Sequence, residues 1–351
     1  MEFRETAWKS FRNLKPRRQK WCSGLNILLG PNGSGKTNLL ESFSVLCGWG
    51  AFAGNRVSSL VSWNGENEKT FLAGWTAGER DVEIHAIIGA RMILRAENER
   101  VTYSALRSLL PSLSFLPQDI NLIDGTPSIR RLFLDKLCAL CSPLYARRLA
   151  EYRQLVRHRT ALLRKGLSVR ATTLPMVQLG GWIWANRRKM ASFLAEKLAQ
   201  ETSLLPHATE ITLCCRGSSG LGNPTEELAV ALETNMERER HARLPLVGPH
   251  RDDLLFSCLD RPATLSLSRG QKRRVVMAAI LAAGRLIEEK LRLKPILLLD
   301  DIAAELDAEG REMAGLALAG TGWQVFITGV EEPFKAQNHA VYRLSAGVLS
   351  S

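Results

Sequence analysis

Short, mainly apolar runs lie near both ends of the chain and are bounded by glycine and polar residues. They cover residues 25–29, 295–299 and 322–328. Runs of this length are typical of strands that are buried on both faces of a parallel sheet. Residues 38–43 read as the start of a helix, so we predict a strand, loop and helix unit near the N-terminus.

The middle of the chain has two further patterns. Residues 57–116 contain short β-branched and apolar segments separated by glycine and charged residues, which predicts an antiparallel sheet. From residue 128 to about 206, leucines and other apolar residues recur near helical spacing. Pro143 and the pair Gly180-Gly181 are the expected helix breaks in this stretch.

A return strand over residues 211–213 and a helix over 225–240 are expected after the helical stretch. We therefore predict an α/β protein in which residues 1–127 and 207–351 form one lobe. Residues 128–206 form an inserted, mostly helical second lobe, and no heptad pattern runs through it long enough to predict a coiled-coil arm.

The loop after the first apolar run has the spacing of a phosphate-binding P-loop, or Walker A motif. It reads Gly30-Pro31-Asn32-Gly33-Ser34-Gly35-Lys36-Thr37, with Asn38 opening the helix. Backbone amides in such a loop turn toward a β-phosphate, the lysine reaches the β- and γ-phosphates, and the threonine hydroxyl binds Mg²⁺. A chance glycine-rich turn is the alternative, and the flanking strand and helix favour an ATP site.

A second candidate motif ends the apolar run at residues 295–299. Asp300 and Asp301 follow it in the form of a Walker B segment, which would lie beside the P-loop on a neighbouring parallel strand. Asp300 would hold Mg²⁺ through its water shell, and Asp301 would orient or deprotonate the attacking water. An exposed acidic turn after a core strand is the alternative.

A third motif precedes the Walker B segment by about thirty residues. Ser268-Arg269-Gly270-Gln271 stands at the start of an expected helix and resembles the signature sequence of the ABC ATPase superfamily. That resemblance implies a head-to-tail dimer in which the signature contacts the γ-phosphate bound to the opposite subunit. A simple helix N-cap is the alternative reading of the same residues.

The superfamily resemblance extends further along the chain. Glu305 and Asp307 occupy the position of the D-loop, which contributes to the dimer contact in this superfamily. Thr328 stands where many ABC ATPases have a switch histidine. Threonine can hydrogen-bond a phosphate or a water but cannot act as a cationic switch, so we expect slow ATP turnover.

Composition points to an anionic partner. The formal net charge is +12, and residues 147–170 contain eight basic residues against Glu151 alone. Such a stripe can follow a DNA phosphate backbone, and a solvated helix face is an equally good reading. The candidate DNA contacts are Arg147, Arg148, Arg153, Arg157 and Arg159. Arg187-Arg188-Lys189 beside Trp182 and Trp184 form a second cluster, in which core packing of the tryptophans is favoured over base stacking.

The seven cysteines are scattered, and the N-terminus lacks the apolar core of a signal peptide. A reducing, cytoplasmic setting without a membrane span is therefore expected. Cys138 and Cys141 have CxxC spacing within an apolar segment whose pattern predicts a helix, which favours buried thiols over zinc or redox chemistry.

Several runs together resemble the bacterial RecF family over nearly the whole chain. Besides the nucleotide motifs, they are Phe11-Arg12-Asn13, Gly50-Ala51-Phe52, Phe115-Leu116-Pro117, Gly125-Thr126-Pro127, Arg130-Arg131-Leu132-Phe133-Leu134-Asp135 and Gly248-Pro249-His250-Arg251-Asp252-Asp253-Leu254. The resemblance implies a two-lobed ATPase head with a flanking antiparallel sheet. It further implies ATP-dependent dimerisation, binding to single-strand/double-strand DNA junctions, recombinase loading, support of the SOS response, and RecR-like and RecO-like partners.

One position departs from that pattern, and two arginines within it have alternative roles. Gln118 replaces the acidic residue usual in RecF-like proteins and is a candidate Q-loop sensor near Mg²⁺. Arg130 and Arg131 would either meet phosphate or, in the case of Arg131, pair with Asp135 one helical turn away.

Three functions are compatible with these motifs. The first is a weak, DNA-stimulated ATPase, and the second is a nucleotide-gated DNA clamp or adaptor with incidental hydrolysis. The third is the ATPase of a membrane transporter, which the basic helical insertion disfavours.

Overall fold

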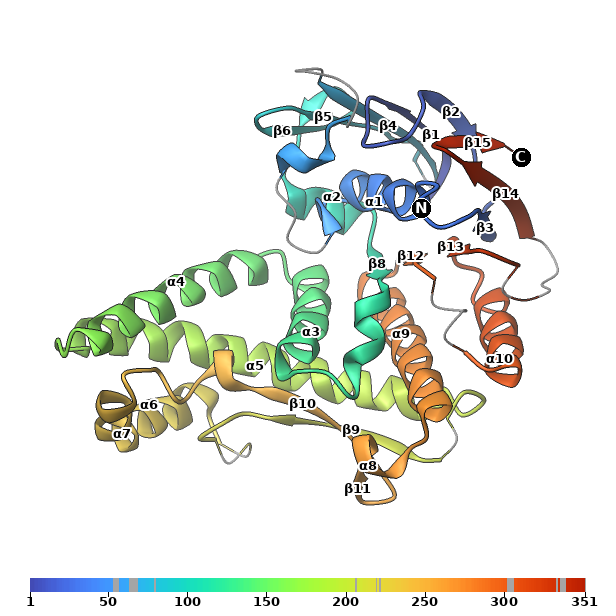
Figure 1. Cartoon of the computed structure of the whole chain (residues 1–351). Coiled ribbons are helices and arrows are strands. Elements are labelled where there is room, and N and C mark those ends of the chain that lie inside the picture. The colour runs from blue at the N-terminus through green and yellow to red at the C-terminus, as the bar shows by residue number, and fades with distance from the viewer. Residues whose placement is uncertain are drawn as a thin grey trace. The chain divides into compact units, whose positions relative to one another are not determined.

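The computed structural model describes residues 1–52, 57–62, 69–78, 80–205, 207–218, 220, 222–301, 306–332, 334 and 339–350. The chain forms two compact units (Figure 1). Unit 1 comprises Met1–Ile120, Ser203–Pro206 and Ser268–Ser351, and unit 2 comprises Asn121–Thr202 and His207–Leu267.

Unit 1 contains a six-stranded sheet that is parallel except at one edge. Its order is β15-β14-β3-β13-β12-β8, and only β15 runs antiparallel to its neighbour. The strands are β3 (Leu25–Leu29), β8 (Ser112–Phe115), β12 (Ile296–Leu299), β13 (Val325–Gly329), β14 (His339–Ser345) and β15 (Val348–Ser350). Every residue of β3, β12 and β13 is buried, as the apolar runs predicted.

A second sheet in unit 1 is wholly antiparallel, with the order β2-β1-β4-β5-β6-β7. Its strands are β1 (Glu2–Lys9), β2 (Arg17–Lys20), β4 (Thr70–Ala77), β5 (Glu83–Ile88), β6 (Met92–Ala96) and β7 (Glu99–Arg100). The antiparallel sheet predicted within residues 57–116 is thus confirmed, with two further strands supplied by the N-terminus.

Helix α1 (Lys36–Leu46) joins the cores of the two sheets. Its Phe43 ring stacks on Phe326 of β13 with centroids 4.0 Å apart, and Trp21 packs edge-on against both rings. Aromatic pairs of this kind add to the stabilisation from apolar burial. The helix that follows the P-loop is therefore fixed from both sides.

The other helices of unit 1 are α2 (Tyr103–Leu109), α9 (Arg269–Leu291), α10 (Ala308–Ala319) and the 3-10 turn η2 (Val57–Leu60). The 3-10 segment η3 (Pro117–Leu122) carries the chain from unit 1 into unit 2. Most of the central part of α9 is buried, and Gly284 lies directly against the Trp323 ring, where any side chain would collide.

Unit 2 combines long helices with a three-stranded antiparallel sheet of order β11-β10-β9. Its elements are α3 (Pro127–Cys141), α4 (Tyr145–Arg164), α5 (Arg170–Gln200), β9 (Thr209–Cys214), α6 (Pro224–Thr234), α7 (Met236–Ala242), η4 (Pro249–Arg251), β10 (Asp253–Cys258), β11 (Arg261–Pro262) and α8 (Ala263–Ser266). Helix α5 packs on β9 and α6, and α3 packs on β10.

The division of the chain differs from the predicted lobes. Residues 207–267, expected to belong to the ATPase lobe, cluster with the helices of unit 2. The reason is that β9 and β10 pair with each other and cover α3 and α5, so their apolar faces are buried within that unit. The sequence pattern gave the strand but not the surface against which it packs.

Two predicted helix boundaries were wrong. Gly180 and Gly181 lie inside α5. A Cβ on Gly181 would lie 2.5 Å from the Thr225 Cα of α6, so the close approach of the two helices requires glycine there. These glycines permit close helix packing and do not end the helix. The helix predicted over 225–240 is interrupted at Asn235, whereas Pro143 does separate α3 from α4.

None of the helices in the described ranges is long and apolar enough to cross a membrane. The seven cysteines are free, with Cys138 buried in α3. Within the same ranges, no group of histidine, cysteine and carboxylate side chains has the arrangement of a metal site.

Candidate nucleotide site

The P-loop lies between β3 and α1, and its backbone follows the path its glycines allow. Gly33 and Gly35 have φ of 77° and 109°, in the left-handed region that glycine adopts without strain. Lys36 Nζ donates to the carbonyl oxygens of Gly30 and Pro31, at 2.6 and 3.1 Å. The ammonium group is thereby held over the loop, where a bound phosphate would meet it.

A pocket of about 310 Å³ opens at this loop. It is lined by residues 32–38 together with Pro117, Asp300 and Asp301. Walker A and Walker B residues, more than 250 positions apart in sequence, therefore line one cavity. The volume lies at the lower end of the range of small-molecule sites.

Asp300 is the centre of the polar contacts in this pocket. Its Oδ2 accepts from the Thr37 hydroxyl at 2.8 Å, and its Oδ1 accepts from the Thr328 hydroxyl at 2.7 Å. Burial raises the pKa of Asp300 above its usual value, while the two hydroxyls act in the opposite direction. Asp300 is thus a buried carboxylate held by one hydroxyl from the first turn of α1 and one from β13.

The strands that precede the Walker A and Walker B residues were predicted to be neighbours, and in the structure they are not. β3 and β12 are parallel, but β13 lies between them and pairs with both. Thr328 on β13 fills the gap, since it donates to Asp300 and accepts from the backbone N–H of Asp301 at 2.9 Å. Thr328 was predicted as a sensor, and in the structure it is fully buried and positions the Walker B acids.

Asp301 has an unusual backbone and an unpaired oxygen. Its φ is 52°, in the left-handed region, which is tolerated by aspartate but costs free energy in most residues. Its Oδ1 is buried and has no hydrogen-bond partner in the part of the chain that the structure describes. A buried carboxylate oxygen without a partner is costly, so this geometry is what a ligand or ordered water would relieve.

Ser34 was predicted only as a member of the loop, and the structure gives it a particular environment. Its Oγ is also buried without a partner among the described residues. A Cβ on Gly30 would lie 2.8 Å from that oxygen, so the absence of a side chain at position 30 leaves room for the hydroxyl.

Two segments distant from the motifs support the P-loop, and the sequence did not predict them as site elements. Asn13 Oδ1 accepts from the side chain of Asn38 at 2.7 Å. The backbone N–H of Gly347, in the turn between β14 and β15, donates to the Ser34 carbonyl at 2.9 Å. The Gly347 carbonyl in turn accepts from Lys15 N, also at 2.9 Å. The pair Ala346-Gly347 was the available sequence signal for a turn, but pairs of this kind are common, and the positive φ of both residues is seen only in the structure.

The signature residues open α9 as a capping box. Ser268 Oγ accepts from Gln271 N, and Gln271 Oε1 accepts from Ser268 N at 2.9 Å. The N-cap reading is therefore satisfied, and the contact with a second subunit stays a prediction. A Cβ on Gly270 would lie 3.2 Å from Asp307 Oδ2, which places the signature beside the residue that caps α10.

Of two other predicted site residues, one lies beside the pocket and the other lies outside the residues that the structure describes. Gln118 is exposed on η3, next to Pro117 of the pocket wall, and its role as a sensor stays a prediction. Glu305 lies outside the described residues.

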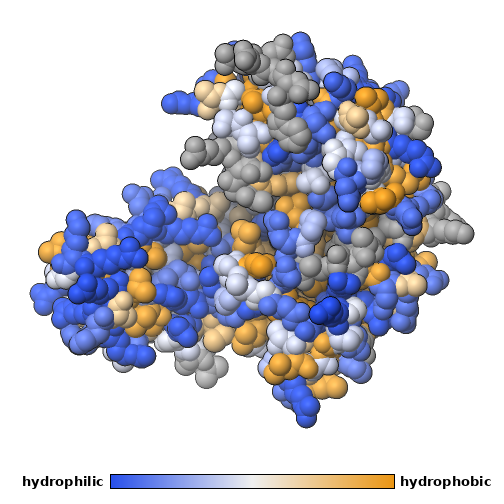
Figure 2. All heavy atoms as spheres, in the orientation of Figure 1, coloured by the Kyte–Doolittle hydropathy of each residue, from blue (hydrophilic) through white to orange (hydrophobic). Residues whose placement is uncertain are grey.

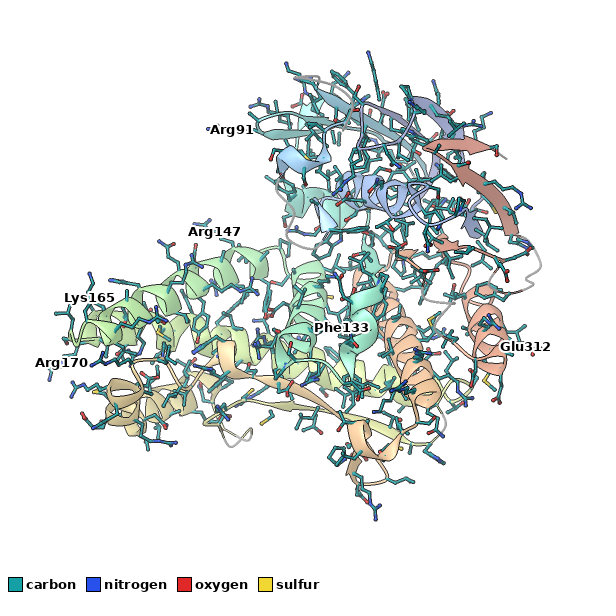
Figure 3. All side chains as sticks on the ribbon, in the orientation of Figure 1. Arg91, Phe133, Arg147, Lys165, Arg170 and Glu312 are labelled. Carbon is teal, nitrogen blue, oxygen red and sulfur yellow. The ribbon has the colours of Figure 1, made fainter. Side chains whose placement is uncertain are left out.

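The predicted basic stripe is only partly a surface. Arg159 is fully buried and binds Glu239 through two nitrogens at 2.7 and 2.8 Å, so its prediction as a DNA contact was wrong. Arg148 lies over the Trp182 ring, and Arg147 pairs with Glu151. Figure 3 shows Arg147, Lys165 and Arg170 pointing away from the ribbon of unit 2.

The remaining predicted contacts of this stripe are exposed. Arg153 binds Asp135 at 3.3 Å but is about half exposed, and Arg157 is exposed on α4. In Figure 2 the surface over α4 and the adjoining part of α5 is mostly hydrophilic. These residues stay candidates for DNA contact.

Of the second basic cluster, Arg187 belongs to an interior ion-pair core, which we define as Arg187, Asp135, Asp252, Tyr145 and Trp184, whereas Lys189 is exposed. Arg187 binds Asp135 at 2.9 Å and Asp252 at 2.6 Å, and all of these side chains are buried. Trp184 Nε1 donates to Asp252 and the Tyr145 hydroxyl donates to Asp135. Core packing is thus confirmed for Trp184, whereas Trp182 is only partly buried, and Arg187 cannot reach DNA.

Arg130 and Arg131 likewise have partners within unit 2. Arg130 forms a bidentate pair with Asp253 at 2.6 and 2.9 Å. Arg131 donates to the backbone carbonyl of Asp252, whereas Asp135 is held by Arg187 and Arg153. The structural role is confirmed, but not the predicted partner of Arg131.

Comparison with known proteins agrees with the motifs. The profile described as the RecF/RecN/SMC N-terminal domain matches residues 3–348. The DNA replication and repair protein RecF of Heliobacterium modesticaldum is 30% identical, with 100% of this chain and 99% of that protein covered. The RecF of Deinococcus deserti is 33% identical over 95% and 91% of the two chains.

Solved structures show the same fold. A structure of the recombination mediator protein RecF-ATPrS in the RecFOR pathway matches with a TM-score of 0.87 and 23% identity, covering 99% of this chain and 97% of that one. An Smc head bound to the C-terminal winged-helix domain of ScpA matches with a TM-score of 0.60 and 15% identity. On the extent and identity of the sequence matches, this chain belongs to the RecF family of DNA replication and repair proteins.

Proposed function

We propose that this chain is an ATP-dependent DNA-binding protein of replication and recombinational repair. The observation that carries the nucleotide part is the convergence of Thr37 and Thr328 on Asp300 inside the P-loop pocket. Membership of the RecF family supports the repair role. In this proposal the protein dimerises on ATP at single-strand/double-strand junctions, promotes recombinase loading and supports the SOS response.

The pocket suits ATP with Mg²⁺. Lys36 and the amides of residues 33–37 offer positive charge and donors for phosphates, and Thr37 and Asp300 offer the hard oxygen ligands that Mg²⁺ prefers. The unpaired oxygens of Ser34 and Asp301 lie where such a ligand would give them partners. Thr37 and Asp300 would hold Mg²⁺, which when bound would neutralise charge on the phosphates.

Asp301 is the proposed catalytic residue. Its carboxylate lines the pocket and has an oxygen free to accept a proton or orient a water. Because Thr328 is committed to Asp300, the chain has no cationic switch at that position, and we expect a weak, DNA-stimulated ATPase. The same observation favours the second candidate, a nucleotide-gated clamp in which hydrolysis is incidental.

The proposed active form is a homodimer. The capping box of Ser268 and Gln271 fixes the start of α9, and Asp307 fixes the start of α10 beside it. Both helix N-termini carry partial positive charge, which suits contact with the γ-phosphate of a nucleotide held by a second copy. DNA and RecR-like and RecO-like mediators are the proposed partners, in the cytoplasm.

Sedimentation velocity with and without ATP tests the proposal. The wild type should shift from monomer to dimer with ATP, and Lys36→Ala should not. A wild type that stays monomeric at saturating ATP would contradict the mechanism. ATP hydrolysis by Asp301→Asn separates the two candidates, since an unchanged rate would remove Asp301 as the base and favour the clamp.

A further inference from the structure

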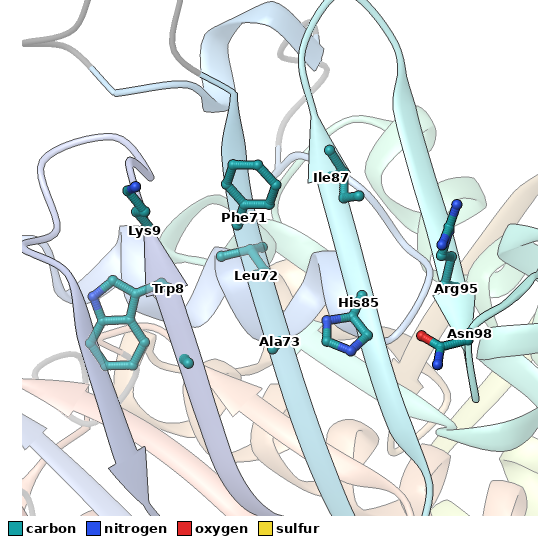
Figure 4. A pocket seen from close by; sticks show the side chains of 10 residues that line it. Trp8, Lys9, Phe71, Leu72, Ala73, His85, Ile87, Arg95 and Asn98 are labelled. Atoms are coloured by element: carbon teal, nitrogen blue, oxygen red, sulfur yellow. The ribbon is translucent and has the colours of Figure 1, made fainter.

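The outer face of the antiparallel sheet in unit 1 has a trough that the nucleotide site does not use (Figure 4). Strand registers place three rows of side chains across β1, β4 and β5 on this face. The central row is Ala7, Ala73 and His85, which are directly opposite one another on neighbouring strands. Two alanines in a row leave a hollow between the larger side chains on either side.

The walls of the trough are apolar and aromatic. One wall is the row Lys9, Phe71 and Ile87. Beyond the alanine row, outside the trough itself, Trp75 lies four residues from Phe71 on the same face of β4, with the Arg18 guanidinium over its ring. At about 3.4 Å per residue these two aromatic positions are roughly 14 Å apart. Phe71 is 44% exposed, which is high for a phenylalanine in a sheet.

The charged residues that line the trough, Lys9 and Arg95, are both basic. Lys9 and Arg95 stand on β1 and β6, at either side of the trough, and both are exposed. The carboxylates of the face, Glu5 and Glu83, are bound by Arg18 and His85. For Lys9 and Arg95, no carboxylate partner lies within the described ranges of the chain. The surface is therefore complementary to an anion that also has apolar faces.

We propose that this trough binds single-stranded nucleic acid, with a base stacked on Phe71 and phosphates near Lys9 and Arg95. The proposal rests on the DNA-binding function proposed above and names a surface for it. A base offers a flat apolar face to the ring, and each nucleotide brings a phosphate for the flanking cations. A duplex keeps its bases inside, so it could not use Phe71.

An acidic peptide fits less well. A peptide that binds a sheet through its backbone adds to an edge strand, whereas this trough crosses the strands on the face of the sheet. A peptide lying in it would gain no ladder hydrogen bonds.

The test is fluorescence anisotropy of the full chain with a labelled oligothymidylate of about 15 nucleotides. Phe71→Ala should weaken binding roughly tenfold without changing the salt dependence, because a base stack releases no counterions. Lys9→Ala and Arg95→Ala should each reduce the slope of log affinity against log salt by about 0.7. For an abasic oligonucleotide, Phe71→Ala should have no effect.

Matched controls are available on other surfaces of unit 1. Leu316→Ala removes an exposed apolar side chain from α10, and Arg343→Ala removes an exposed cation from β14. Both should bind the oligonucleotide as the wild type does. Binding of a fluorescent ATP analogue by every variant would show that the P-loop unit is folded.

The outcomes separate the trough from the proposed function. Unchanged oligothymidylate binding in Phe71→Ala, Lys9→Ala and Arg95→Ala, with normal wild-type binding, would overturn the trough and leave the DNA-binding function standing. Equal losses for the abasic and normal oligonucleotides would overturn base stacking. The same three variants are also tested with a labelled oligoglutamate peptide. If they lose binding to oligoglutamate and keep binding to oligothymidylate, the trough is a site for an acidic peptide and the proposal is overturned. A wild type that binds no DNA at low salt would contradict the proposed function itself.

Discussion

The ion-pair core of unit 2 and the P-loop pocket of unit 1 both bury charged side chains, and they differ in how many of those groups have partners. In the core, Arg187 joins two carboxylates that also accept from Trp184 and Tyr145. In the pocket, oxygens of Ser34 and Asp301 are buried without partners among the described residues. Burying a polar group without a hydrogen bond is costly, so the saturated set is explained by folding and the unsaturated one by a ligand.

Basic residues in the two units differ in the same way. A cluster of arginines in sequence indicates either a nucleic-acid surface or buried ion pairs, and burial decides between them. Arg187 and Arg159 are buried against carboxylates, whereas Arg157 is exposed. The comparison therefore predicts stability losses in unit 2 and ligand-binding losses in unit 1.

The largest expected effect is at a second buried ion pair of unit 2, Arg159 with Glu239. Arg159→Met leaves Glu239 as an uncompensated buried charge, which should lower the free energy of unfolding by about 3–5 kcal/mol. Arg157→Met, two residues away on the exposed side of α4, should change it by less than about 0.5 kcal/mol. Urea unfolding of both variants measures the difference. Equal losses would mean that burial of the pair does not set its contribution.

Only the exposed arginine should matter for DNA. Arg157→Met is expected to reduce the salt dependence of DNA binding, and Arg159→Met is not, provided that binding is measured where the variant is folded. A flattened salt slope in Arg159→Met alone would contradict its assignment to the core.

The next effect is a pH dependence in unit 2. Burial lowers the pKa of His250 to about 4, and nearby arginines act in the same direction. Its ring lies 2.9 Å from the Tyr152 hydroxyl. The unfolded chain therefore binds this proton first, so stability should fall as pH drops from about 6.5 toward 4, by roughly 3 kcal/mol in total.

His250→Gln isolates this contribution. The wild-type and variant unfolding free energies should converge as the pH falls, because carboxylates titrate alike in both and only the histidine term differs. A pH-independent difference would mean that His250 does not titrate between the folded and unfolded states.

In the P-loop pocket, loss of a buried charge is expected to reduce activity and not stability. Asp300→Asn removes the carboxylate that would hold Mg²⁺ and should reduce ATP turnover about a hundredfold. Because burial of the charge is unfavourable, stability should stay equal or rise. Steady-state hydrolysis and thermal melting measure the two. A large loss of stability would place Asp300 with the structural carboxylates of unit 2.

The sequence predicted the parts of this site that depend on local spacing. Runs of a few residues were enough to predict the P-loop, the buried strands and the two carboxylates Asp300 and Asp301. Thr328 was predicted as a site residue, but its hydrogen bond to Asp300 was not. That bond depends on β13 lying between β3 and β12, and the spacing of motifs does not encode strand order.

Other features depended on tertiary packing. The burial of Arg159 depends on Glu239, eighty residues away, and no local pattern indicates that pair. The assignment of residues 207–267 to unit 2 likewise follows from the packing of β9 on α5. The support of the P-loop by Gly347 joins positions more than three hundred residues apart.

The smallest predicted effect tests that support. Gly347 has φ of 80°, and a Cβ there would collide with the carbonyl oxygen of Asn13. Gly347→Ala should displace the turn that binds Ser34 and weaken ATP binding roughly fivefold, since a loss of about 1 kcal/mol of positioning corresponds to that factor. Gly166→Ala is the matched control, because Gly166 also has positive φ but has open space around it. It should pay a similar backbone strain and bind ATP normally. Equal affinity in both variants would show that the turn at Gly347 does not position the P-loop, while weaker binding in Gly347→Ala alone would extend the site to the C-terminal hairpin.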